Sequence, residues 1–108
     1  MRLFIKTEKF KKETLELSNN ERKNFLLMHK EWVKKISQSG KYIHSGYLIN
    51  KNKMPGGGGL LIFEAQDYVT AKEIIENDPM IKHKLVIWNL QEWISIYESQ
   101  PNLKNHLG

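Results

Sequence analysis

Two residues that lie far apart in the sequence, His29 and Asp78, carry the side chains needed for acid–base chemistry. His29 lies among apolar residues in a segment with helical periodicity, and Asp78, one of only two aspartates, precedes Pro79. A histidine among apolar neighbours needs a hydrogen-bond partner, because an unpaired buried polar group costs free energy. A carboxylate in contact with His29 would fix its tautomer and leave the other ring nitrogen to take or give a proton. Such a pair could move a proton next to a carbonyl group, which is isomerase or elimination chemistry.

The same two residues also have a purely structural interpretation. His29 could be a buried histidine bonded to a backbone carbonyl, and Asp78 could serve only as a turn residue after a helix. Composition alone favours this structural interpretation.

Three further residues are candidates for binding a ligand beside His29. Trp32 follows His29 by one helical turn, so it could form the wall of a pocket for a flat ring or belong to the core. His44 and Gly46 lie in another apolar segment. They could line the same pocket or a dimer interface, or have only structural or exposed positions. No spacing of histidines and carboxylates is typical of a metal site, so neither a metal nor a cofactor is implied.

Two helices are predicted around these residues. Ser18-Asn19-Asn20-Glu21 is a capping box, and Gly40 is a plausible stop for the helix that follows it. At about 100° per residue, one face of this helix carries Phe25, His29, Trp32 and Ile36. A second helix is predicted over 65–77, with Asp67 as N-cap and the Asp78-Pro79 turn as its end.

Four apolar segments predict strands at residues 3–5, 42–49, 60–63 and 85–97. A bulge or a close backbone approach is expected at Gly46, and a bulge near residues 89–92. Residues 50–59, which end in four glycines, are expected to form a flexible hairpin loop rather than a phosphate cradle. Residues 1–97 are expected to form a single domain, and residues 98–108 a polar C-terminal tail.

The resulting order, strand–helix–strand–strand–helix–strand, predicts an α+β fold. It is the ferredoxin-like arrangement, a four-stranded antiparallel sheet with two helices on one face. The strands carry apolar residues at both parities, as Leu60-Leu61-Ile62-Phe63 shows. Because both faces of the sheet should then be buried, we expect a homodimer in which two sheets pack face to face.

Composition narrows the class of protein. The 108-residue chain has no cysteine, which favours a cytoplasmic location, and it has no apolar segment long enough for a signal peptide or a membrane span. The formal net charge of +5 permits nucleic-acid binding. The basic residues are dispersed, however, and no basic stripe is interleaved with exposed aromatic residues, so this hypothesis ranks last.

The order of short motifs along residues 1–97 resembles the YCII-related family. The motifs are His29-Lys30-Glu31-Trp32-Val33 before Gly40, the strand with Gly46, the glycine-rich loop before Leu61-Ile62-Phe63-Glu64-Ala65, and Asn77-Asp78-Pro79-Met80 before a tryptophan-bearing strand. The resemblance implies a ferredoxin-like subunit in a dimeric α+β barrel. It also implies a pocket in which His29 and Asp78 lie together.

Some relatives in this family are dehydrochlorinases or lactone isomerases of aromatic-ring breakdown, and most have no known reaction. This chain departs from the family pattern in its lysine-rich residues 6–12, its uniform glycine run and its tail. The departures leave the substrate open.

Three functions follow in order of preference. The first is an enzyme in which His29, oriented by Asp78, acts as acid or base on a small cyclic or carbonyl compound. In this enzyme Lys6, Lys41 or Lys53 could attract an anionic substrate. The second is a non-catalytic module that binds or senses a small ligand in the same pocket. The third is weak nucleic-acid binding through the basic surface.

Overall fold

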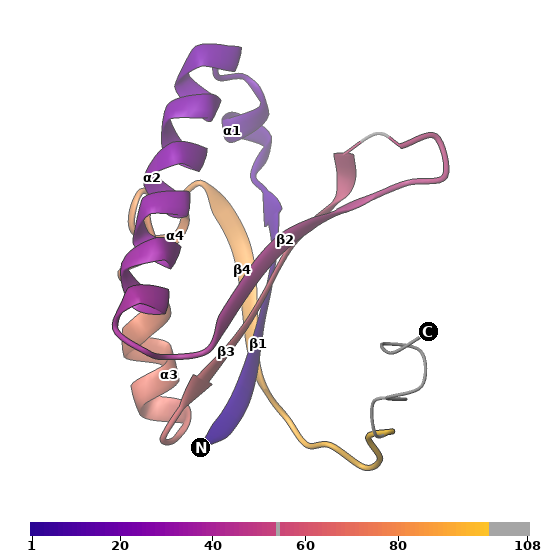
Figure 1. Cartoon of the computed structure of the whole chain (residues 1–108). Coiled ribbons are helices and arrows are strands. Elements are labelled where there is room, and N and C mark those ends of the chain that lie inside the picture. Colours follow the sequence, from indigo (N-terminus) through magenta and orange to yellow (C-terminus); the bar gives the residue numbers. More distant parts are fainter. Residues whose placement is uncertain (54, 100–108) are drawn as a thin grey trace, which may run out of the picture.

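The sheet and its helices adopt the predicted ferredoxin-like α+β arrangement (Figure 1). The computed structural model describes residues 1–53 and 55–99, leaving aside the side chains of residues 55–57. Its elements are β1 (Arg2–Phe10), α1 (Lys12–Leu15), α2 (Asn19–Gln38), β2 (Ile43–Ile49), β3 (Pro55–Ala65), α3 (Tyr68–Ile75), α4 (Pro79–Lys82) and β4 (Val86–Trp93). The strands pair antiparallel in the order β2-β3-β1-β4, and the helices cover one face.

Helices α2 and α3 begin where local capping signals predict, whereas α1 begins at Lys12 without a side-chain cap. The Ser18 hydroxyl accepts a hydrogen bond from the Glu21 backbone N–H at 3.1 Å, and the Glu21 carboxylate reaches back to the Ser18 N–H. Gly40, with a φ of +91°, follows the end of α2. The Asp67 carboxylate accepts from the Thr70 N–H at 2.8 Å and caps α3. These contacts satisfy backbone groups that a helix leaves unpaired at its ends.

Side chains alternate between the two faces of the sheet, as the period of two requires. The face under the helices is the core, and its central cluster consists of Phe4, Leu61, Phe63, Ala65, Ala71, Ile75 and Leu90. Lys6 lies on this same face of β1 and has no exposed surface. The core face therefore includes a buried cation, and its partners lie at the candidate site.

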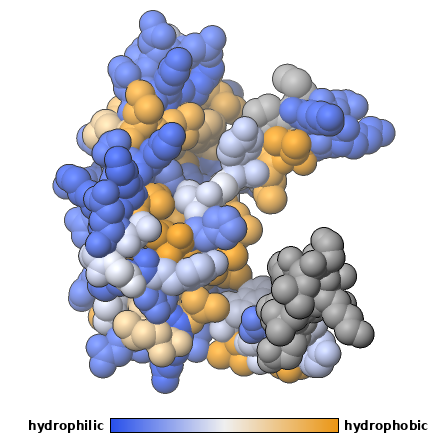
Figure 2. Space-filling model, viewed as in Figure 1, coloured by the Kyte–Doolittle hydropathy of each residue, from blue (hydrophilic) through white to orange (hydrophobic). Residues whose placement is uncertain are grey.

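The opposite face of the sheet, here called the open face, carries exposed apolar side chains. Ile87 is 68% exposed, Trp93 53% and Leu48 50%. Figure 2 shows hydrophobic side chains gathered on the hollowed side of the molecule, below the projecting β2–β3 hairpin. Among the residues that the structure describes, no helix lies over this face in Figure 1. Among the described residues, no helix is both long and apolar enough to cross a membrane.

The prediction of a loop over residues 50–59 is wrong for its second half. Strand β3 begins at Pro55, and Gly59 pairs with Glu8 of β1 and with Tyr47 of β2. Glycine has a low intrinsic strand preference, so the glycine run indicates a loop when it is read locally. Pairing on both sides outweighs that preference.

The irregularities expected at Gly46 and near residues 89–92 do not occur there. Gly46 pairs in register with Leu60, a Cβ built on Gly46 would meet nothing within 4 Å, and the register shift lies between Tyr47 and Ile49. Strand β4 pairs with β1 without a shift from Val86 to Trp93, where it ends. Its apparent change of parity arises because Trp93 lies on the open face.

One further segment differs from the prediction, and another lies mostly outside the described residues. Helix α4 lies where no helix is predicted. Most of the polar tail expected at residues 98–108 lies outside the described residues, which end at Ser99.

Candidate active site

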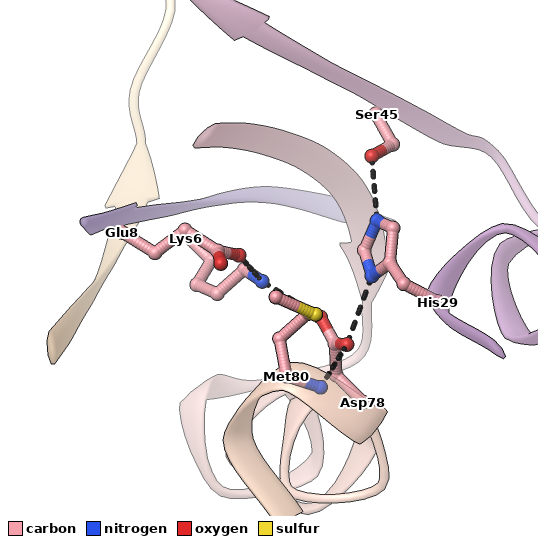
Figure 3. Close-up of polar contacts among 6 residues, drawn as sticks. All are labelled: Lys6, Glu8, His29, Ser45, Asp78 and Met80. Atoms are coloured by element: carbon pink, nitrogen blue, oxygen red, sulfur yellow. Dashed lines mark hydrogen bonds and ion pairs between the residues drawn. The ribbon is translucent and has the colours of Figure 1, made fainter. Parts of the chain in front are cut away.

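The Asp78 carboxylate is buried at the start of α4, where three donors reach it (Figure 3). Asp78 is the N-cap, and Pro79 occupies the first turn, where a missing N–H is harmless. The Oδ1 atom accepts from the Met80 N–H at 3.0 Å and from His29 Nδ1 at 2.8 Å. The Oδ2 atom accepts from Lys6 Nζ at 2.7 Å. Asp78 is thus both the turn residue that the structural interpretation expects and the hydrogen-bond partner of His29.

Lys6 joins this carboxylate to a second one. Its side chain, with no exposed surface, forms ion pairs with Asp78 and with Glu8, whose side chain is 11% exposed. Lys6 and Glu8 are two residues apart on β1, so both side chains lie on the helix face of the sheet. A buried ammonium group needs such partners, because an unpaired charge in the interior is strongly unfavourable.

His29 connects the buried carboxylate to a hydroxyl at the edge of the sheet. It comes from α2, and its side chain is 16% exposed. Because an ionised carboxylate can only accept, the Nδ1 atom must carry the proton that is shared with Asp78. In the neutral ring, Nε2 then holds a lone pair, and it lies 2.8 Å from Ser45 Oγ of β2. The Ser45 hydroxyl therefore donates to His29 when the ring is neutral.

The surroundings of Asp78 keep it ionised. Burial alone would raise its pKa, but the hydrogen bond from His29 and the positive charge of Lys6 outweigh burial and hold the pKa below its ordinary value. With neutral His29, the charges of Lys6, Glu8 and Asp78 sum to −1. An imidazolium at His29 would therefore lie beside a net negative charge.

Of the other predicted site residues, only Trp32 lies beside His29. The centroids of the two rings are 5.8 Å apart, with 39° between their planes. Trp32 also packs against the core cluster, as the core interpretation predicts, and its part in a ligand pocket stays a prediction.

His44 and Gly46 lie on the other side of β2 from Ser45, because successive side chains of a strand alternate. They line a shallow hollow on the open face with Tyr47, Leu48, Leu60 and Ile62. The structure thus places them on the opposite side of the sheet from His29, and their part in binding a ligand stays a prediction.

Two residues of the site were missed or misjudged at the level of sequence. Ser45 stands between the two candidates of β2, and the alternation of strand side chains is the signal that could have found it. Lys6, one of three lysines that could attract an anionic substrate, is buried and already paired with two carboxylates. Alternation with Phe4 could have indicated its burial. Within the described part of the chain, no three His, Asp or Glu side chains are grouped so as to hold a metal ion.

Comparison with solved structures supports the fold. The chain is similar to 5-chloro-2-hydroxyhydroquinone dehydrochlorinase (TftG) from Burkholderia phenoliruptrix AC1100, solved in complex with 2,5-dihydroxybenzoquinone. The TM-score is 0.64 at 21% sequence identity, and the match covers 85% of this chain and 93% of that one. At this identity, the similarity establishes the shared fold only.

Comparison by sequence identifies the family. No curated protein matches the chain significantly. A family model, the YCII-related domain, matches residues 3–94 and so spans every strand except the first residue of β1. The matched range includes Lys6, Glu8, His29, Ser45 and Asp78, the series of bonded residues that is here called the contact chain. The chain belongs to the YCII-related domain family.

Proposed function

We propose that this protein is a small-molecule enzyme of the lyase or isomerase type, with His29 as the acid–base group and Asp78 as the residue that orients it. The observation that carries the proposal is the 2.8 Å hydrogen bond between His29 Nδ1 and a fully buried, ionised carboxylate. The imidazole at the other end of this bond is partly exposed, so a substrate can approach it.

The mechanism uses Nε2 of His29 as the base. A substrate that replaces the Ser45 hydroxyl at Nε2 would place an acidic C–H, next to a carbonyl group, within reach of the lone pair. The proton moves to Nε2, and Asp78 stabilises the imidazolium through Nδ1. Return of the proton to another carbon gives an isomerisation, and departure of an anionic leaving group gives an elimination.

The comparisons guide the choice of first substrates. The structurally similar protein is named as a dehydrochlorinase, and its structure holds a dihydroxybenzoquinone. The Trp32 ring beside His29 is compatible with a flat ring in the site. Small, oxygenated ring compounds with an acidic proton are therefore the first compounds to test.

The first test measures the turnover of 5-chloro-2-hydroxyhydroquinone through the release of chloride. The second measures the turnover of a panel of small lactones through the change in absorbance. We expect wild-type turnover to fall about 10²–10⁴-fold in His29→Ala, which is the usual contribution of an acid–base group. Asp78→Asn should lower turnover while preserving the shape of the side chain. His83→Ala is a matched control, because His83 is exposed and lies outside this contact chain. Equal turnover in wild type and His29→Ala would exclude the proposed role.

The alternative function is a binding or sensing module that uses the same residues as an anchor. It is supported by the fact that Nε2 already has a hydrogen-bond partner, Ser45, which a ligand could replace without any reaction. Saturable binding of 2,5-dihydroxybenzoquinone in calorimetry, with no turnover of any compound in the panel, would favour the module over the enzyme.

The active form in this proposal is a homodimer in which two open faces pack together. The exposed apolar side chains of Leu48, Ile87 and Trp93 support it, because a large apolar patch exposed to water is unfavourable. Two such sheets packed face to face would form an α+β barrel with the helices outside.

A further inference from the structure

We propose that Ser45 is a nucleophile, and that the protein can transfer the acyl group of a small ester or lactone through a covalent intermediate on this residue. The basis is the order of contacts Asp78–His29–Ser45. The carboxylate Oδ1 lies 2.8 Å from Nδ1, and Nε2 of the same ring lies 2.8 Å from the serine Oγ. A carboxylate, an imidazole and a hydroxyl joined in this order form a nucleophilic triad, which is recognised by geometry and roles rather than by sequence order.

Each residue of the proposed triad is placed as its role in the reaction requires. Asp78 is ionised, and a carboxylate accepts at Nδ1, which directs the lone pair of Nε2 toward the Ser45 hydroxyl. A serine hydroxyl is a weak nucleophile until a base within hydrogen-bond reach takes its proton. Nε2 of His29 lies at that distance, 2.8 Å from Ser45 Oγ. Lys6 and the Met80 N–H hold the carboxylate on its other sides, so the orienting group is fixed.

The pairing of β2 supplies a donor for the oxygen that becomes negative. The Glu64 N–H donates to the Tyr42 carbonyl oxygen at 3.1 Å, and the register from there pairs Ser45 with Leu61. Backbone groups of successive residues in an antiparallel strand point to alternate sides, so the N–H of Ser45 points away from β3. Strand β2 is one of the two edge strands of the sheet. This N–H therefore faces outward next to the hydroxyl, where it can stabilise a tetrahedral oxyanion.

The surroundings restrict the substrate to small acyl compounds. Ser45 is half-buried, and the helix that carries His29 and Trp32 lies over its hydroxyl. A compact ester or a lactone can reach such a group more readily than a long chain can. The Trp32 ring offers an apolar surface to a flat acyl or leaving group.

The reaction balances without a cofactor. The Ser45 Oγ forms a bond to the carbonyl carbon as its proton moves to Nε2, and the carbonyl oxygen becomes an oxyanion facing the Ser45 N–H. The oxyanion then collapses, the bond to the leaving oxygen breaks, and this oxygen takes the proton from Nε2. Water repeats the two steps on the acyl-serine, which releases the acid and restores the Ser45 hydroxyl. Asp78 remains ionised throughout.

The test uses p-nitrophenyl acetate with the full-length protein. We expect a burst of one nitrophenolate per site, which is the sign of an accumulating acyl-enzyme, and an acetyl group on Ser45 in peptide mass spectrometry. Ser45→Ala should lose the burst and the adduct, and His29→Ala should acylate at least about 100-fold more slowly. Ser37→Ala is the matched control, because Ser37 is an exposed serine of α2 away from the site. Absence of a burst, or acetyl groups only on lysines, would overturn the proposal.

A second probe keeps the test decisive if Ser45→Ala does not fold. A fluorophosphonate loses fluoride when a serine oxygen attacks phosphorus, and we expect its adduct in wild-type protein on Ser45 alone. The proposal shares His29 and Asp78 with the proposed lyase or isomerase, but the two can fail separately. Turnover that depends on His29, with no Ser45 adduct, overturns only the acyl transfer. A Ser45 adduct with no elimination or isomerisation overturns only the lyase or isomerase.

Discussion

Lys6 is the single residue whose removal tests how the Asp78 carboxylate is held. Its ammonium group lies between the carboxylates of Asp78 and Glu8, with no exposed surface. Lys6→Met keeps most of the apolar stem but leaves two buried or nearly buried negative charges without their cation. Removing one partner of a buried ion pair costs about 3–5 kcal/mol, so we expect a loss of this size in the free energy of unfolding, measured with urea. Lys9→Met, at an exposed position of the same strand, should change it by less than about 0.5 kcal/mol.

The lowered pKa of Asp78 gives stability a defined dependence on pH. Because the pKa in the folded state lies below the ordinary value of 3.8, ionised Asp78 stabilises the fold above that value. The contribution is lost as the pH falls through the lower folded-state pKa. We expect the difference in unfolding free energy between wild type and Asp78→Asn to be largest above about pH 5 and to shrink below pH 3.8. A difference that grows in acid would contradict this assignment.

At the scale of elements, helices α2 and α3 could be predicted because their signals are local, whereas α1 begins without a side-chain cap and α4 lies where no helix is predicted. A serine and a glutamate three residues apart determine the start of α2, and Asp67 determines that of α3. The strand that contains the glycine run could not be predicted this way, because its pairing with β1 and β2 involves residues far away in sequence. The same reason explains the site. His29 and Asp78 could be paired by chemistry and family resemblance, whereas Ser45 and Lys6 join them only through the register of the sheet.

The glycine run has a specific packing consequence at Gly59. A Cβ built on Gly59 would lie 2.9 Å from Cγ and 3.3 Å from Cδ of Glu8, the residue that pairs with Lys6. Gly59→Ala must therefore displace the Glu8 side chain, and overpacking of this kind typically costs about 1–3 kcal/mol. We expect the cost to shrink in a Glu8→Ala background, as a double-mutant cycle of urea unfolding would show. Gly46→Ala is the matched control, since its Cβ would meet nothing within 4 Å. Equal costs in both backgrounds would contradict the contact.

On the scale of the whole molecule, β2 directs side chains both toward the helices and toward the open face of the sheet. It directs Ser45 toward the helices and the His29 ring, and it directs His44 and Leu48 toward the open face. A partner packed on the open face would therefore support the same edge strand that carries the proposed nucleophile. In this way the proposed dimer would hold the position of Ser45 without contributing a residue to the contact chain.

The proposed dimer can be tested by charging one face at a time. Ile87 is 68% exposed on the open face, and Leu27 is 52% exposed on α2, on the other side of the molecule. A lysine at position 87 would bury an unpaired charge if two open faces pack together, which is strongly unfavourable. We expect wild type and Leu27→Lys to sediment as dimers at micromolar concentration, and Ile87→Lys as a monomer with unchanged secondary structure. If wild type itself is monomeric, the open face is not a dimer interface. If Leu27→Lys dissociates and Ile87→Lys does not, the interface lies on the helix side instead.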